Sequence, residues 1–163
     1  MMLGLSLSAF TTLHVIISLV AIAAGLVVFY QMLNSQFSPP LTLLFLAMTI
    51  LTSVTGFMFP IAAFTPAIGF GIVSLVALAL SVYALYSRHL AGAWRWIYVV
   101  TALFALYLNV FVLVVQAFQK IPALNALAPN GSEPPFAIAQ VVVLLAFLYF
   151  GYRAVKTFRT RGA

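Results

Sequence analysis

Polar side chains that can do chemistry are rare in this sequence, and those that occur stand inside long apolar stretches. Asn109, Gln116 and Lys120 occupy positions i, i+7 and i+11, which places them on one face of a helix. His14 and Ser18, four residues apart, share a face in the same way. Amide, ammonium, imidazole and hydroxyl groups can together hold the polar part of a small molecule by hydrogen bonds and charge. These residues are therefore the first candidates for a binding site.

Composition places the whole chain in lipid. Of its 163 residues, 66% are hydrophobic and 5% are charged, whereas a soluble domain carries about 25% charged residues. The absence of cysteine excludes disulfides, thiolate metal sites and a cysteine nucleophile. The net charge of +6 comes from residues at the ends of apolar stretches. We therefore expect contacts with membrane lipids and no nucleic-acid partner.

Polar and proline-rich breaks divide the sequence into five apolar stretches, each long enough to cross a bilayer. Because backbone amides in lipid must be paired internally, we predict an all-α, polytopic bundle of five transmembrane helices. It forms a single transmembrane domain over residues 1–163. The N-terminal stretch has no basic segment before it and is interpreted as a retained helix. The predicted spans are about 8–33, 41–59, 66–87, 94–120 and 136–158, with a loop at 121–135.

Basic residues predict the orientation of the bundle. With five spans, the loop before the fourth span and the C-terminal tail lie on the same side. Only Lys120 among the seven basic residues then falls on the opposite side. The positive-inside rule gives N-out, C-in. The six residues on the inner side are Arg88, Arg95, Arg153, Lys156, Arg159 and Arg161.

In this topology the polar residues within the spans share a depth, in the outer half of the membrane. Polar groups in lipid are costly, so their common depth predicts a polar cavity that opens outward. The candidates for its lining are His14, Ser18, Thr52, Asn109, Gln116, Lys120, Glu133 and Gln140. The alternative is that Ser and Thr bond their own helix carbonyls and that the amides join neighbouring helices.

The loop at 121–135 contains Glu133, the only acidic side chain of the protein. Glu133 or Ser132 can cap the fifth span, and Lys120 suits the C-terminal end of the fourth. The two charges can also pair across the loop. Between them, "PALNALAP" predicts a short helix on the membrane surface.

No known catalytic motif is present, and we predict no cofactor and no metal site. H-E-x-x-H, G-x-S-x-G and P-loop patterns are missing from the sequence. A single carboxylate excludes a paired-carboxylate mechanism within one chain. Haem bound through His14, from one copy or from two, is the alternative to having no cofactor. The other histidine, His89, lies at the opposite membrane face in this topology.

One region resembles a group of known proteins. "WRWIYVVTALFALYLNVFVLVVQAF", "FQKIPALNALAP" and "EPPFAIAQ", which together span about 94–140, are similar to segments of small integral membrane proteins of bacteria. The resemblance implies a multi-pass protein of the bacterial inner membrane. It implies no activity and identifies no site residue.

Three functions follow from these observations. The favoured one is binding or transport of a small molecule in the periplasmic half of the membrane. The second is a non-enzymatic accessory or assembly subunit, in a homo-oligomer or a larger membrane complex. Its basis is the set of phenylalanines at the outer helix ends, namely Phe10, Phe57, Phe59, Phe64, Phe118 and Phe136. The third is an enzyme that acts on a lipid or quinone headgroup through His14, Lys120 and Glu133.

Overall fold

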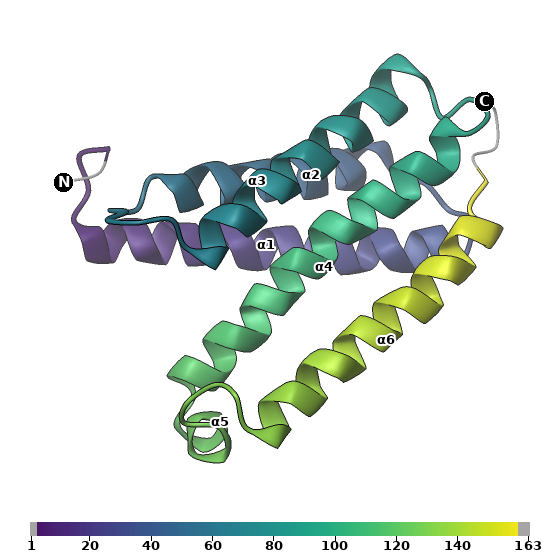
Figure 1. Ribbon diagram of the computed structural model, residues 1–163. Helices are drawn as coiled ribbons and strands as arrows, with labels where there is room; N and C mark the ends of the chain where they lie inside the picture. The colour runs from purple at the N-terminus through teal and green to yellow at the C-terminus, as the bar shows by residue number, and fades with distance from the viewer. Residues whose placement is uncertain (1–2, 160–163) are drawn as a thin grey trace.

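A computed structural model describes residues 3–159 and confirms the all-helical prediction. Figure 1 shows the arrangement of the helices. The described residues form no strand. The helices are α1 (Leu7–Leu33), α2 (Pro39–Phe57), α3 (Pro66–Val82), α4 (Trp94–Lys120), α5 (Pro122–Leu127) and α6 (Pro134–Thr157). A π-helical turn, Tyr83–Ser87, extends α3. All but α5 are long and apolar enough to cross a membrane.

Proline pairs begin two of these helices earlier than predicted. Pro39 starts α2 and Pro134 starts α6, whereas the sequence analysis placed both prolines of each pair before the helix. Proline suits the first turn because its missing N–H would have no intrahelical partner there and its φ is already helical. At its other end, α2 stops at Phe57, two residues before the predicted boundary. The short helix predicted within 122–129 is α5.

The long helices run alternately up and down, which defines two sides of the bundle. The N-terminal side holds the start of α1, the loop 58–65 and α5. The C-terminal side holds the loops 34–38 and 88–93 and the end of α6. The two ends of the described chain therefore lie at opposite sides (Figure 1).

The packed core occupies the C-terminal side. Its largest buried side chains include Tyr98, Phe45, Leu106 and Phe158, each 0% exposed. The core as a whole comes from the second half of α1, the first half of α2, the end of α3, the first half of α4 and the end of α6. Large apolar side chains there fill the space between helices, which fixes the helices relative to one another on this side.

At Gly25, α1 lies close against α2 and α4. A Cβ atom added at Gly25 would lie 2.6 Å from the Leu106 Cδ1 of α4 and 2.8 Å from the Phe45 ring of α2. A small residue therefore lets the three helices meet at this point. Beyond it, toward the N-terminal side, α4 and α6 diverge from α1, α2 and α3 (Figure 1).

Hydrogen bonds at the C-terminal side hold the end of α6. The Arg95 Nη1 donates to the carbonyl oxygens of Val155 and Phe158, at 2.8 and 2.7 Å. These carbonyls belong to the last turn, which has no intrahelical donor for them. The Ser35 hydroxyl donates to the Arg159 carbonyl and accepts from the Arg159 N–H, both at 2.8 Å. The α4–α6 pair is thus fixed at one end and spread from the bundle at the other.

Candidate functional site

A cavity of about 760 Å³ occupies the N-terminal side, where the helices diverge. One wall comes from the first half of α1 and the second half of α2. The loop 58–65 and the start of α3 form a second wall, and the second half of α4 forms the third. Volumes of about 300–1,000 Å³ are typical of small-molecule sites. The cavity is therefore large enough for a ligand.

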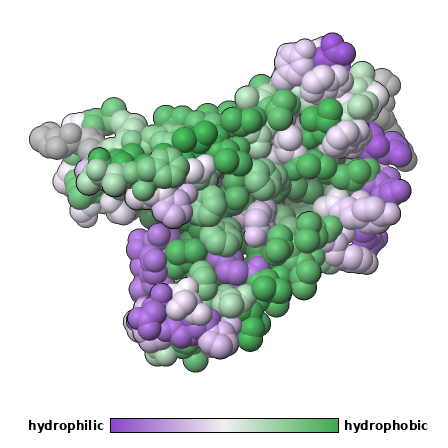
Figure 2. All heavy atoms as spheres, viewed as in Figure 1, coloured by the Kyte–Doolittle hydropathy of each residue, from purple (hydrophilic) through white to green (hydrophobic). Residues whose placement is uncertain are grey.

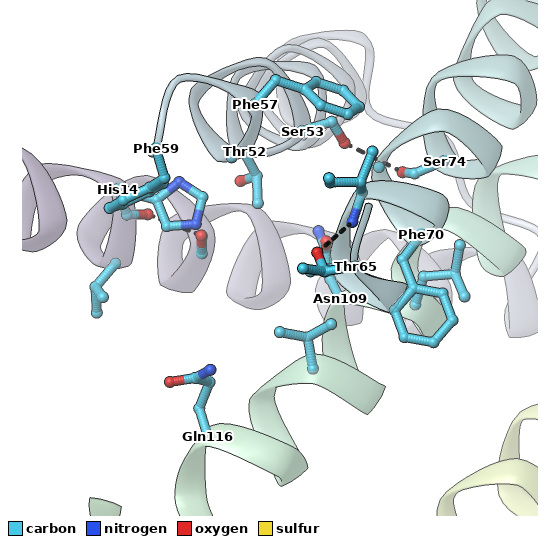
Figure 3. A pocket seen from close by; sticks show the side chains of 18 of the residues that line it. His14, Thr52, Ser53, Phe57, Phe59, Thr65, Phe70, Ser74, Asn109 and Gln116 are labelled. Atoms are coloured by element: carbon cyan, nitrogen blue, oxygen red, sulfur yellow. Dashed lines mark hydrogen bonds between the residues drawn. The ribbon is translucent and has the colours of Figure 1, made fainter. Parts of the chain in front are cut away.

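Six of the eight predicted residues line this one cavity. His14 and Ser18 come from α1, and Thr52 comes from α2. The other three are on α4: Asn109, Gln116 and Lys120. Figure 3 shows His14, Thr52 and Gln116 around the open space. The rest of the lining is mostly apolar and includes Leu19, Ile22, Phe70, Leu108 and Val112.

A hydrogen bond to α2 occupies one ring nitrogen of His14. Its Nδ1 lies 2.7 Å from the Thr55 Oγ1. The Thr55 hydroxyl also lies 2.7 Å from the Leu51 carbonyl. When it donates its proton there, its oxygen accepts from the Nδ1–H of His14, and the Nε2 of a neutral His14 is then left with a lone pair. Phe59 packs edge-on against the same ring, with centroids 5.2 Å apart.

Hydroxyl groups on α1 and α2 are already committed as donors. Ser18 donates to the His14 carbonyl at 2.7 Å, and Thr52 donates to the Met48 carbonyl at 2.8 Å. Thr11, which also lines the cavity, donates to the Leu7 carbonyl at 2.8 Å. These hydroxyls follow the structural alternative raised from the sequence. Toward a ligand they offer oxygen lone pairs, as acceptors.

The α4 wall carries amide and ammonium groups instead of hydroxyls. The Asn109 Nδ2 is buried and has no hydrogen-bond partner among the described residues. An unpaired buried donor costs about 1–3 kcal/mol. Gln116 and Lys120 follow on the same helix face, two and three turns closer to the membrane surface. Gln116 and Lys120 therefore give this wall an amide and an ammonium group that can donate to a ligand.

The other two predicted residues lie outside the cavity. The Gln140 Nε2 donates to the Phe111 carbonyl at 3.2 Å and so joins α6 to α4, as the packing alternative predicted. Glu133 is in the loop before α6. The structure thus brings His14 and Lys120 to one site and leaves Glu133 out of it.

Glu133 stands at the N-cap position of α6, but its carboxylate bonds to the preceding loop. Its Oε1 accepts from the backbone N–H and the Nδ2 of Asn130, and its Oε2 accepts from the Ser132 N–H. Desolvation raises the pKa of Glu133, but these hydrogen bonds together outweigh it and hold the pKa below its ordinary value. Both oxygens are occupied, and the described residues form no Lys120–Glu133 ion pair.

Metal binding gains no support from the side chains of residues 3–159. No group of three or more His, Cys, Asp or Glu side chains among them could hold a metal ion. His14 remains a lone imidazole with a free Nε2.

Three features in or beside the cavity were not among the predicted site residues. Thr55 is not part of the lining, but its hydroxyl bonds to the Nδ1 of His14. Ser53 and Ser74 bond each other at 3.3 Å between α2 and α3, and both line the cavity. Thr52 and Thr55, three residues apart at the depth of His14, were a usable signal. The loop 58–65 gave none, because its sequence is apolar and lacks a helical period.

Comparisons of the chain with known protein families, with curated proteins and with solved structures find no match. The geometry of the cavity is therefore the basis for assigning a function.

Proposed function

We propose that this protein binds a small molecule in the cavity between α1, α2, α3 and α4, as a carrier or transporter within a membrane. The observation that carries the proposal is a cavity of about 760 Å³ into which α1, α2 and α4 bring polar side chains, among them His14, Gln116 and Lys120. Polar groups that lie within an apolar lining can fix the orientation of a small molecule.

We also propose the membrane and the orientation. The C-terminal side of the described chain carries Arg88, Arg95, Arg153, Lys156 and Arg159; Arg161 lies outside the described residues. The N-terminal side carries Lys120. By the positive-inside rule the cavity opens away from the cytoplasm, in the bacterial inner membrane. A thiol introduced at Asn125 should react with an impermeant reagent added from outside. Labelling from the cytoplasm alone would reverse the orientation.

The phenylalanines that suggested a subunit role pack largely within the chain. Phe10 contacts Phe59 and Phe118 contacts Phe136, with ring centroids 5.1 and 5.4 Å apart. Phe64 is the exception, with 74% of its surface exposed. This favours ligand binding over a subunit role as the first function to test.

The test is native mass spectrometry of the protein gently extracted from its own membrane. We expect a small molecule to accompany the wild type and to be lost from His14→Ala and Gln116→Ala. Gln119→Ala is the matched control, because Gln119 lies three residues from Gln116 on α4 but is exposed and outside the cavity lining. It should keep the ligand.

A stoichiometric partner protein with no small molecule would contradict the proposal and favour a subunit role. So would equal ligand retention in Gln116→Ala and Gln119→Ala, because the bound molecule would then lie elsewhere on the protein.

A further inference from the structure

The two polar walls of the cavity have complementary hydrogen-bonding character, and this restricts the ligand. On the α1–α2 wall, Ser18 and Thr52 donate their protons to helix carbonyls, and His14, whose Nδ1 bonds to Thr55, has its Nε2 left for a ligand. On the α4 wall, Lys120 carries an ammonium group and Gln116 carries an amide that can donate N–H groups. A ligand that satisfies both walls needs an O–H group toward α1 and acceptor oxygens toward α4.

The charge of the cavity lining restricts the ligand further. Lys120 is the only charged residue in the lining of the cavity. The one acidic side chain of the protein, Glu133, has both oxygens bonded to Asn130 and Ser132. The ammonium group therefore meets no carboxylate in the cavity, and an anionic group of the ligand would be its counter-ion. Hydrogen bonds between an ammonium and an anionic oxygen are among the stronger ones in proteins.

The apolar part of the lining favours a ligand with an apolar portion. Leu19 and Ile22 on α1 face Leu108, Val112 and Leu113 on α4 across the cavity. Lys120 is at the last residue of α4, whereas Leu108 is twelve residues earlier, about 18 Å deeper at 1.5 Å per residue. Polar groups at the surface end and apolar side chains along the depth match an amphiphile with one chain.

The shape of the bundle supplies a route from the bilayer. The α1 and α4 helices are in contact at Gly25 and Leu106 and separate toward the N-terminal side. Figure 2 shows a notch between the N-terminal end of the bundle and the lobe that contains α5, with hydrophilic atoms along the edge of that lobe. The notch opens sideways, where the acyl chains of the bilayer would lie.

Resting on the proposed function, we propose that the ligand is a single-chain amphiphile whose headgroup carries both an anionic group and a hydroxyl, and that it enters from the lipid between α1 and α4. The anionic oxygens bind Lys120 and Gln116. The hydroxyl donates to the Nε2 of His14, and the chain lies along Leu113 and Val112.

The test compares four probes with the same palmitoyl chain, for binding to the purified protein in neutral detergent. Palmitoyl lysophosphatidate has an anion and a hydroxyl, palmitate has only the anion, monopalmitin has only hydroxyls, and methyl palmitate has neither. We expect lysophosphatidate to bind best and methyl palmitate least. Removing the anion should weaken binding about tenfold or more, the size of one hydrogen bond to a charged group. Glycerol 3-phosphate, the same head without a chain, should not compete.

Two substitutions assign the contacts. Lys120→Gln should remove the preference of lysophosphatidate over monopalmitin, and Lys156→Gln, on the opposite side of the bundle, should not. His14→Asn retains an amide near the Nδ1 position and removes Nε2. It should erase the preference for lysophosphatidate over palmitate while leaving palmitate binding unchanged.

Other results separate this inference from the proposed function. If monopalmitin binds as tightly as lysophosphatidate, or if Lys120→Gln changes nothing, the anionic headgroup is wrong while the cavity still binds a ligand. If no probe binds but the native protein carries a molecule that Gln116→Ala releases, the amphiphile class is wrong and the proposed function stands. If no probe binds and no native ligand is found, both fail.

Discussion

Replacement of Gly25 by alanine tests whether close packing of α1 against α2 and α4 holds the closed end of the cavity. The new Cβ would lie 2.6 Å from the Leu106 Cδ1 and 2.8 and 2.9 Å from two atoms of the Phe45 ring. Both neighbours are 0% exposed, so neither can turn outward. Overpacking of this kind costs about 1–3 kcal/mol.

The alanine also gains helix propensity, about 1 kcal/mol over glycine, which hides part of that cost. Gly151→Ala in α6 is the matched control, because it makes the same gain in a helix interior and its Cβ would meet only the Leu103 Cδ1, at 3.8 Å. The difference between the two variants therefore isolates the overpacking. We expect the free energy of unfolding of Gly25→Ala to be about 1–3 kcal/mol lower than that of Gly151→Ala.

The assay is reversible unfolding in mixed micelles, followed by circular dichroism. Equal unfolding free energies for the two variants would refute the reasoning, because there would then be room for a methyl group between α1 and α4 where they cross. A Gly25→Ala variant that is more stable than the wild type would refute it more strongly.

The remaining predictions concern single hydrogen-bonded groups. Thr55→Val leaves the Nδ1 of His14 without its hydrogen-bond partner and should lower the unfolding free energy by about 1–3 kcal/mol in the same assay. Thr12→Val removes an exposed hydroxyl that bonds only to its own helix and should change the unfolding free energy little. Arg95→Met removes two hydrogen bonds to the end of α6 and should speed amide exchange in its last turn, and unchanged exchange would show that packing alone holds that end. The hydrogen bonds that Glu133 accepts lower its pKa and hold the loop before α6 in place while the carboxyl group is ionised. This stabilisation is fully present above the ordinary carboxyl pKa and is lost as the pH falls through the lowered pKa. Amide exchange at Ser132 should accelerate over that range in the wild type and show no such step in Glu133→Gln.

Helix number and position followed from the sequence because both depend on local rules. A long apolar run between polar breaks can satisfy its backbone in lipid only as a helix. The two errors at helix starts share one cause. Pro39 and Pro134 were interpreted as helix breakers, whereas a proline in the first turn begins a helix. The π-helical turn after α3 has no such local signal in the sequence.

The common membrane depth of the polar residues predicted most of the polar cavity lining, but not which of these residues would lie outside the cavity. His14, Thr52 and Gln116 meet because antiparallel helices bring equal depths together. Gln140 has the same depth, but its side chain faces Phe111 on α4 rather than the cavity. The rotation of each helix about its axis depends on tertiary packing, such as the contact at Gly25. No pattern within a single helix determines that rotation.

The placement of α6 has a consequence for how the sequence of this protein can change over evolutionary time. Ala154 is the only buried residue of α6, and the helix is held by a few contacts, such as those of Gln140 and Phe147 with α4. Most of its side chains therefore face acyl chains, which do not distinguish one branched aliphatic residue from another. Selection on Val142, Leu145 and Leu148 would then preserve hydropathy rather than identity, and substitutions should accumulate faster there than on α4.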